Sequence, residues 1–335
     1  MALWTDLVTP QELTTVARMA LDERERERIS LAQFLPNVTK YDTVVRLSAS
    51  DNGLVDVAEY RAYDAETPIG GGSAGKRITV ELPPLGQKTR VSEYDQLRTR
   101  GTGSDAMLRD AIGAETIKRA KAVADRMELM RGTVLTTGKA MINENKFIAE
   151  SDFERDKSLT VTAGKLWSDA TAARPLEDIF AWQETYVERN GEPAAYAVAS
   201  TKVINALSKS GAFLNPNSVR VRAGLDEINA VLETEGLPQL VRYDRLVRVA
   251  GKSTRVIPDS TLLLLPSDGS DLGATFWGTT LESFEPNYAI QEDDRPGIVA
   301  GAYKEDDPMG VWVKGAAIGM PILANANLTM AATVL

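Results

Sequence analysis

The sequence predicts an α+β fold in which an extended N-terminal third precedes a globular remainder. Apolar residues recur mostly every three or four positions over residues 104–137, and this spacing predicts one long helix. Apolar and polar residues alternate in two runs within residues 54–98, on either side of the glycine-rich stretch 70–75, and this alternation predicts a long hairpin. From residue 139 onward, short strand patterns and short helix patterns follow one another, which is typical of a mixed globular domain.

The first predicted element is a helix within residues 1–35, which carry a modest apolar stripe. The segment DERERER at 22–28 then alternates in charge, and in a helix Glu25 and Arg28 would lie three residues apart and pair. Such alternation is typical of a solvated helix face. The alternative is an arm that faces another protein, and it makes Glu25 and Arg28 candidate inter-subunit contacts.

The predicted hairpin over residues 54–98 has a glycine-rich tip, and Pro83 and Pro84 then impose a rigid, extended break. An isolated two-stranded hairpin is marginally stable in water. These strands carry too little apolar material for a core of their own. We therefore expect the hairpin to lie on another surface, which a second copy of the chain can supply.

Four basic residues gather around this hairpin in a chain that is acidic overall. Lys76 and Arg77 follow the glycine-rich tip, and Lys88 and Arg90 follow the prolines. Surface solubility is one explanation for them. The functional alternative is docking against an acidic patch on a neighbouring subunit, which makes these four residues candidate inter-subunit contacts.

The helix predicted over residues 104–137 is long for a compact domain. Ser104 is a suitable N-cap, Asp105 favours the helix N-terminus, and Gly138 provides a stop. At a rise of about 1.5 Å per residue, such a helix would measure roughly 50 Å. Because only one side of it is apolar, we expect a strut packed on the surface and not a buried helix.

The globular remainder is predicted to alternate strands with helices. Residues 262–265 are all leucine, which favours a central strand. Phe180 and Trp182 cannot share one helix face, so the aromatic residues of that helix, Tyr186 included, are expected to divide between core and interface. The predicted helices cover residues 175–189, 200–208 and 224–235, and the predicted strands lie within 157–165, 194–199, 240–249, 261–265 and 310–335.

The composition excludes several classes of chemistry. The chain of 335 residues has no Cys and no His, which excludes disulfides, thiolate nucleophiles, a Ser-His-Asp triad and zinc held by His or Cys. Its net charge of −9 argues against a dedicated nucleic-acid binder. The N-terminus lacks the features of a signal peptide, and the apolar stretch 315–335 is broken by Pro321. We therefore expect cytoplasmic synthesis and no membrane span.

Two stretches resemble phosphate-binding loops. GGGSAGK at 70–76 matches most of the nucleotide-binding pattern, but Arg77 stands where Ser or Thr should hold magnesium, and a strand pattern follows where a helix should begin. A hairpin tip is the favoured interpretation, and a nucleotide-binding enzyme that uses residues 70–77 stays as an alternative from another functional class. GKST at 251–254 lacks the upstream glycine and is interpreted as a loop between strands.

Carboxylates are abundant, but no pair or cluster of them is marked out as a site. The clusters at 292–294 and 305–307 could offer oxygen ligands to a hard cation, but the spacing of a calcium loop is absent. Solvated loops are the favoured interpretation of both clusters. We therefore expect no catalytic residue, no metal site and no cofactor.

Four stretches of the sequence are similar to one family of viral proteins. They are ITVELPPLGQKTRVSEYDQ at 78–96, the region 175–207 that ends in AAYAVASTKVINAL, IPDSTLLLLPSDGSDLGATFWG at 257–278, and GVWVKGAAIGMPILANANLTMAATVL at 310–335. In these stretches and in the order of its parts, the chain resembles the major capsid proteins of tailed bacteriophages, specifically the phage lambda capsid protein E family.

This resemblance implies the tailed-phage major capsid fold. Its parts would be an N-terminal arm at 1–50, an extended hairpin loop at 51–100, a peripheral domain with the strut helix at 101–193, an axial domain at 194–275, and return strands of the peripheral domain at 276–335. The loops of the axial domain would meet around five-fold and six-fold axes.

The resemblance also implies a structural protein, not an enzyme, that self-assembles into hexamers and pentamers of an icosahedral shell around phage double-stranded DNA. Expected partners are other copies of the chain, a separate scaffolding protein, a decoration protein, a portal, and DNA held only non-specifically. Lys76 is a candidate by position for a covalent cross-link, which we do not expect. The protein would assemble in the host cytoplasm and reside in the virion. An encapsulin-like cellular compartment, which shares the fold, is the main alternative.

Overall fold

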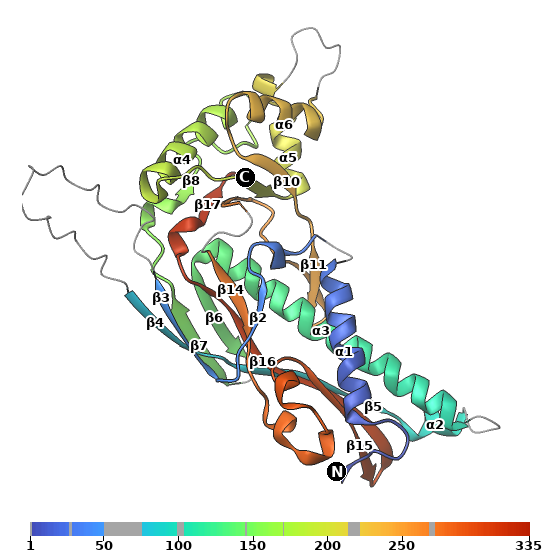
Figure 1. The fold of residues 1–335 in the computed structure, drawn as a ribbon. Helices are drawn as coiled ribbons and strands as arrows, with labels where there is room; N and C mark the ends of the chain where they lie inside the picture. The colour runs from blue at the N-terminus through green and yellow to red at the C-terminus, as the bar shows by residue number, and fades with distance from the viewer. Residues whose placement is uncertain are drawn as a thin grey trace, which may run out of the picture. The chain divides into compact units, whose positions relative to one another are not determined.

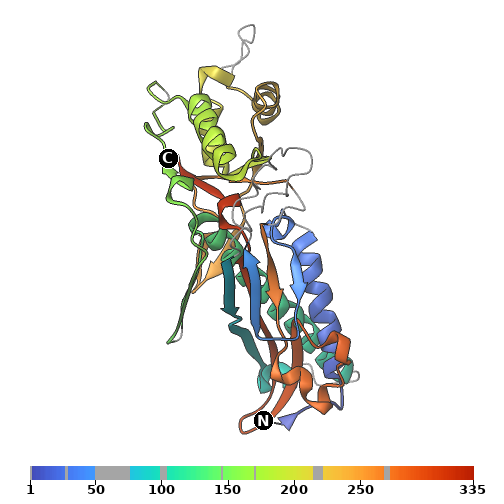
Figure 2. The ribbon, with the colours of Figure 1, turned by 60° about the vertical axis from the view of Figure 1, so that its left-hand side comes forward.

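The computed structural model describes residues 2–26, 29–49, 76–98, 104–144, 146–169, 171–213, 222–267 and 272–335. The chain divides into two compact units, and Figures 1 and 2 show their elements from two directions. Unit 1 comprises Met1–Val45, Val80–Arg131 and Ala274–Pro321, and unit 2 comprises Arg46–Thr79, Gly132–Gly273 and Ile322–Leu335. Each unit therefore combines segments that are far apart in the sequence.

Unit 1 contains a sheet with strand order β1-β15-β16-β14-β2, in which β5 also pairs with β16. Its helices are α1 (Pro10–Arg26), α2 (Glu93–Arg98) and most of α3 (Ser104–Thr137). Its strands are β1 (Ala2–Leu3), β2 (Asn37–Thr39), β5 (Pro84–Val91), β14 (Gly273–Trp277), β15 (Val299–Asp306) and β16 (Met309–Leu323). Its short 3-10 helices are η1 (Leu31–Gln33), η4 (Leu281–Phe284), η5 (Pro286–Tyr288) and η6 (Glu292–Asp294). Strands β3 (Val44–Ala49) and β4 (Lys76–Glu81) pair with each other.

Unit 2 contains a sheet with strand order β10-β9-β13-β17-β8, and two hairpins, β6-β7 and β11-β12. Its helices are α4 (Pro175–Asn190), α5 (Thr201–Leu207) and α6 (Leu225–Thr234), with short 3-10 helices η2 (Lys157–Leu159), η3 (Gly211–Phe213) and η7 (Ala326–Leu328). Its strands are β6 (Lys139–Glu144), β7 (Phe147–Asp152), β8 (Thr160–Thr162), β9 (Tyr196–Ala199), β10 (Gln239–Arg242), β11 (Leu246–Val249), β12 (Lys252–Arg255), β13 (Thr261–Leu265) and β17 (Met330–Thr333).

Helix α1 is shorter than the sequence pattern predicts. It begins after Thr9, whose Oγ1 accepts a hydrogen bond from the Glu12 N–H at 3.2 Å, while the Glu12 carboxylate accepts one from the Thr9 N–H at 3.1 Å. This reciprocal cap fixes the start of the helix at Pro10. The prediction of helix over residues 1–35 was therefore too long, because a cap and a 3-10 turn bound the helical pattern.

The long helix α3 spans Ser104–Thr137, as predicted, and Gly138 ends it with a φ of +70°. The prediction of a strut with one covered side was wrong for its C-terminal half, because no residue from 119 to 136 is exposed. Small residues such as Ala124 and Gly132 let neighbouring backbone and side chains approach on the sides that the apolar stripe does not cover.

The run after the glycine-rich stretch forms β4, as predicted, and the segment after the prolines forms a separate strand. Residues 84–91 form β5, which runs antiparallel to β16, with Pro84 opposite Ile318 and Val91 opposite Val311. This strand is therefore paired within its own chain. Apolar and polar residues do not alternate along β5, because both faces of this strand are only partly covered. The glycine-rich tip and the first predicted strand fall within residues 51–75, outside the described residues.

The second sheet confirms the predicted central strand. All five residues of β13 are buried, and the strand lies between β9 and β17. Helix α4 divides its aromatic residues as predicted: Trp182 and Tyr186 are buried in the core of unit 2, whereas Phe180 is 40% exposed. Trp182 also stacks on Trp167, with ring centroids 5.7 Å apart.

The two phosphate-loop look-alikes adopt strand structure in their described parts. The residues after the glycine-rich stretch form β4, where a nucleotide-binding loop would open a helix. The loop prediction for residues 251–254 was largely wrong, because Lys252 already begins β12. Ala250 and Gly251 make the turn with φ values of 47° and 82°, and this left-handed pair closes a tight hairpin.

Gly113 and Gly132 provide a matched test of how closely α3 is packed. A Cβ on Gly132 would lie 2.3 Å from the Val256 carbonyl oxygen, whereas a Cβ on Gly113 would meet nothing within 4 Å. Gly132→Ala should lower the free energy of unfolding by about 1–3 kcal/mol through overpacking. Gly113→Ala should raise it by up to about 1 kcal/mol, because alanine favours helix. Urea denaturation measures both, and equal effects would contradict this packing.

Candidate assembly surfaces

Two of the predicted contact residues, Lys88 and Arg90, lie on β5 and interact with β15 and β16 of their own chain. The Lys88 ammonium lies 4.7 Å from the centre of the Trp312 ring. The Arg90 guanidinium approaches the Glu305 carboxylate to 3.4 Å and donates to the Pro308 carbonyl oxygen at 2.8 Å. The structure therefore brings these two residues together in one cluster at the end of the β15-β16 hairpin.

Of the other four predicted contact residues, only Glu25 has a described side chain. Lys76 and Arg77 begin β4, but their side chains lie outside the described residues, as does Arg28 altogether. The Glu25 carboxylate is bound within its own chain, by Arg131 at 2.6 Å and by the Asn37 amide at 2.6 Å. Contact of these residues with a neighbouring subunit stays a prediction.

The sequence analysis missed a buried polar network in unit 1 that is centred on Arg131 of α3. The Arg131 side chain is 0% exposed and donates to Glu25 at 2.6 Å and to Glu128 at 3.2 Å. It also donates to Asn37 Oδ1 at 2.6 Å and to Thr275 Oγ1 at 2.8 Å. One guanidinium thus joins α1, β2 and β14 to α3.

Glu128 extends the network to the segment that enters η1. Its side chain is 0% exposed, and its two oxygens accept hydrogen bonds from the Ser30 hydroxyl and the Leu31 N–H, both at 2.8 Å. Burial of a charge is costly unless partners satisfy it, and here each charge has several. The signal in the sequence was Glu128 and Arg131, three residues apart, which lie between Met127 and Val134 of the apolar stripe.

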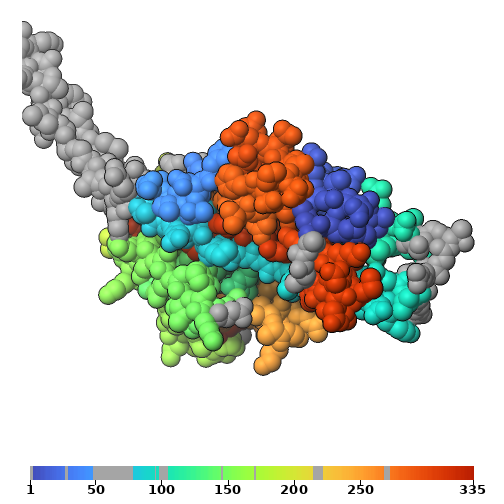
Figure 3. Space-filling model, turned by 90° about the horizontal axis from the view of Figure 1, so that it is seen from below, coloured from blue at the N-terminus to red at the C-terminus, as the bar shows by residue number. Residues whose placement is uncertain are grey.

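Both units expose large apolar side chains. In unit 1, Leu281 and Phe284 of η4 are 83% and 51% exposed, beside a groove of about 480 Å³ between η4, β5 and β16. Figure 3 shows the segment that contains η4, drawn in orange, as a projection beside α1 in dark blue. In unit 2, Ile148 of the β6-β7 hairpin is 75% exposed. Exposed apolar patches of this kind favour contact with another protein.

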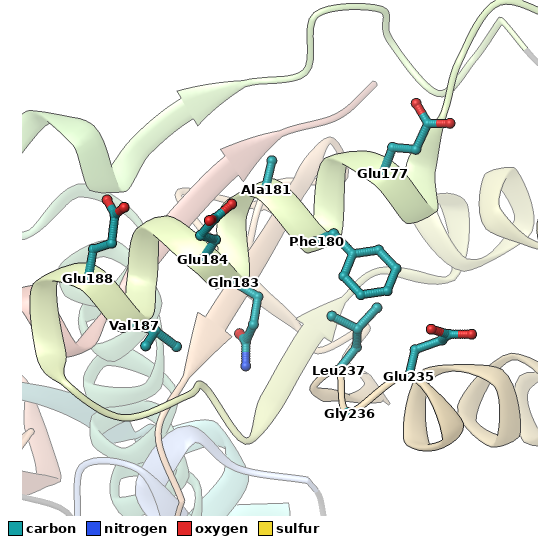
Figure 4. A pocket seen from close by; sticks show the side chains of 10 residues that line it. All are labelled: Glu177, Phe180, Ala181, Gln183, Glu184, Val187, Glu188, Glu235, Gly236 and Leu237. Carbon is teal, nitrogen blue, oxygen red and sulfur yellow. The ribbon is translucent and has the colours of Figure 1, made fainter.

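An acidic groove of about 710 Å³ runs along α4 in unit 2. Phe180 and Leu237 face each other across it, and Gln183 and Val187 point from the same side of α4 (Figure 4). Four carboxylates also line the groove, three of them at its rim on the other side of α4 from Gln183 and Val187 (Figure 4), and none of its lining residues is Lys or Arg. The four are Glu177, Glu184, Glu188 and Glu235.

The β11-β12 hairpin of unit 2 has the opposite character. Leu246, Arg248 and Lys252 are exposed on it, and residues 245–258 contain no Asp or Glu. Within a chain of net charge −9, this hairpin is a local basic surface with an apolar residue at its edge. A basic surface of this kind is attracted to an acidic one on another molecule.

Asp244 anchors the base of this hairpin. Its carboxylate accepts hydrogen bonds from the Thr201 N–H at 3.0 Å and from the Arg255 guanidinium at 2.8 Å, and also from the Thr201 hydroxyl. Burial alone would raise the pKa of Asp244, but these hydrogen bonds and the charge of Arg255 outweigh it, so the pKa is lowered. The ionised carboxylate thus ties β12 to the N-terminus of α5.

These surfaces suit association with other proteins. The described residues contain no cluster of three acidic side chains that could hold a metal ion. Among the same residues, no helix is long and apolar enough to cross a bilayer. Apolar grooves, exposed apolar side chains and complementary charged surfaces remain, and these are the components of protein interfaces.

A comparison with protein families identifies the chain. The sequence profile of the phage major capsid protein E family matches residues 20–334. The chain belongs to this family. No curated protein matches the sequence of this capsid protein. The resemblance seen in the four sequence stretches is thereby confirmed.

Solved structures confirm the fold of the capsid protein. The putative capsid protein of a prophage of Escherichia coli CFT073 is similar with a TM-score of 0.61 and 16% identity, over 96% of this chain and 99% of that one. A phage-related protein from Bordetella bronchiseptica RB50 is similar with a TM-score of 0.57 and 12% identity, over 95% and 96% of the two chains. The capsid of Cyanophage P-SCSP1u gives a TM-score of 0.50 at 9% identity, over 90% and 86%. The chain therefore has the tailed-phage major capsid fold.

Family and fold together indicate a structural role in the shell of a virion, not an enzymatic one. The family match also favours a phage capsid over the encapsulin-like compartment and over a nucleotide-binding enzyme. The five-part division of the capsid protein stays a prediction.

The buried network can be tested on Arg131. Arg131→Met leaves the fully buried Glu128 without its arginine and should lower the free energy of unfolding by about 3–5 kcal/mol. Adding Glu128→Gln to it should recover part of the loss, because the uncompensated charge is removed. Arg109→Met, which removes an exposed pair with Glu12, should cost less than about 1 kcal/mol. Urea denaturation measures all three, and similar losses for Arg131→Met and Arg109→Met would contradict the network.

Asp244 should make stability depend on pH. Because its pKa is lower when folded than when unfolded, its contribution is present above the unfolded value of about 3.9 and is lost as the pH falls through the folded value. The melting temperature of Asp244→Asn should therefore lie below that of the wild type at pH 6, and the two should converge toward pH 3. Thermal melts across this range measure the difference, with Asp110→Asn as an exposed control. A difference that persists unchanged at pH 3 would contradict the assignment.

Proposed function

We propose that the chain is the major subunit of an icosahedral phage shell built from its hexamers and pentamers around double-stranded DNA. The observation that carries the proposal is the match to the capsid protein E family over residues 20–334. Exposed apolar residues in both units support it, because a shell subunit must bury such surfaces on its neighbours.

The proposal includes a separate scaffolding protein during assembly in the host cytoplasm, and a portal and a decoration protein on the finished particle. The proposal of these partners rests on the match to the capsid protein E family. DNA would be enclosed and not gripped, because a chain of net charge −9 can neutralise few phosphates. No covalent cross-link between subunits is part of the proposal.

The capsid protein should form closed particles when it is produced together with the proposed scaffolding protein. Negative-stain electron microscopy of the purified protein should show shells, or free hexamers and pentamers when scaffold is withheld. Mass spectrometry of the shells distinguishes the alternative, because an encapsulin-like compartment would contain a cargo enzyme and form without scaffold. A protein that stays monomeric under all these conditions would contradict the proposal.

A further inference from the structure

The groove on α4 combines negative charge with an apolar floor. Phe180 and Val187 are 40% and 36% exposed there, whereas Leu237 is 8% exposed and closes the floor. Its four Glu side chains have no Lys or Arg among the residues that line the groove with them. An occupant that matches this chemistry carries positive charge and an apolar side chain.

Gln183 gives an independent indication of the occupant. It lines the groove and is 7% exposed, and its amide nitrogen donates to the Ala194 carbonyl oxygen at 3.2 Å. Its Oε1 is buried and accepts no hydrogen bond from any described residue. An unsatisfied buried acceptor is costly, so the groove favours an occupant that brings hydrogen-bond donors.

The β11-β12 hairpin carries the positive charge and the exposed apolar side chain that match the groove. Arg248 and Lys252 supply cationic donors, and Leu246, 46% exposed, supplies the apolar side chain. The three residues belong to one short hairpin. Its tight turn at Ala250 and Gly251 holds strands β11 and β12 in register. Preorganised groups of this kind lose little freedom on docking.

One copy cannot join these two surfaces by itself. No hairpin residue lines the groove, and α4 and β11 are well separated within unit 2 (Figure 1). Each copy therefore presents both an acidic groove and a basic hairpin at different places. A contact between two different surfaces of identical chains is heterologous, and repetition of it closes into a ring when the rotation allows.

We propose that the β11-β12 hairpin of one subunit docks in the α4 groove of the next subunit around the capsomer. This inference rests on the proposed function and adds the pair of surfaces that orders the ring. The hairpin cations meet the carboxylates of Glu184 and Glu188, and Leu246 lies against Phe180. Charge complementarity sets the direction of the ring, because groove against groove or hairpin against hairpin would place like charges together.

Zero-length cross-linking tests the contact directly. Shells assembled from a mixture of light-nitrogen and heavy-nitrogen protein are treated with a carbodiimide, which couples a carboxylate to an amine. Peptides that join Lys252 to Glu184 or Glu188 and combine a light with a heavy partner are the expected product. Lys252→Arg is the matched control: it keeps the charge and should assemble normally, but it should lose these cross-links. Wild-type shells without any Lys252 cross-link to the groove would overturn the proposal.

Charge reversal tests whether the contact drives assembly. Glu184→Lys with Glu188→Lys, or Arg248→Glu with Lys252→Glu, should each reduce the yield of shells about tenfold or more, since like charges would then meet. All four substitutions together should restore assembly. Asp110→Lys with Glu233→Lys makes the same change in net charge as the double substitution at Glu184 and Glu188, but at exposed positions outside the groove, and should assemble as the wild type does.

Circular dichroism of each variant separates misfolding from lost contact, and the restored quadruple variant shows that the reversed surfaces still fold. Reversal variants that are folded and assemble like the wild type would overturn the docking proposal alone, with the shell function intact. A wild-type protein that never assembles would overturn both. A quadruple variant that is folded but stays unassembled would also overturn the pairing of these two surfaces.

Discussion

Unit 1 depends on one buried cation, the Arg131 guanidinium, and on the oxygen atoms gathered around it. Through Glu25, Glu128 and Asn37, this group ties the N-terminal helix and the β2 segment to the long helix α3. An arginine can do this where a lysine could not, because its planar group offers several donors in fixed directions. This arrangement fixes the N-terminal helix and the β2 segment to the rest of unit 1.

The outer surfaces differ in kind from this internal network. Inside unit 1, opposite charges are matched within one chain and withdrawn from solvent. On unit 2, an acidic groove and a basic hairpin are matched in character but lie apart, and they are exposed. Identical subunits that carry two complementary surfaces can associate in only one direction. Internal matching thus stabilises the subunit, and in the proposed docking external matching would give order to the assembly.

The spacing of apolar residues along the sequence predicted the helices and strands that depend mainly on neighbouring residues. The stripe over residues 104–137 gave α3 with its glycine stop, and the leucines at 262–265 gave the central strand β13. Strand β5 was missed because its polar residues carry no alternation, and only its pairing with β16 makes it a strand. The burial of the second half of α3 was missed because Ala and Gly were not counted as core residues, although close approach requires them.

The sequence by itself determined which chemistry is excluded and where the long helix α3 and the central strand β13 form, because composition and periodicity are properties of neighbouring residues. The absence of His and Cys excluded several classes of chemistry, and the family-specific stretches indicated a structural role. Only the tertiary structure decided that Glu128 and Arg131 are buried partners and not surface charges, and that Phe180 and Leu237 share one groove. These outcomes depend on which distant segments meet, and no local pattern records that.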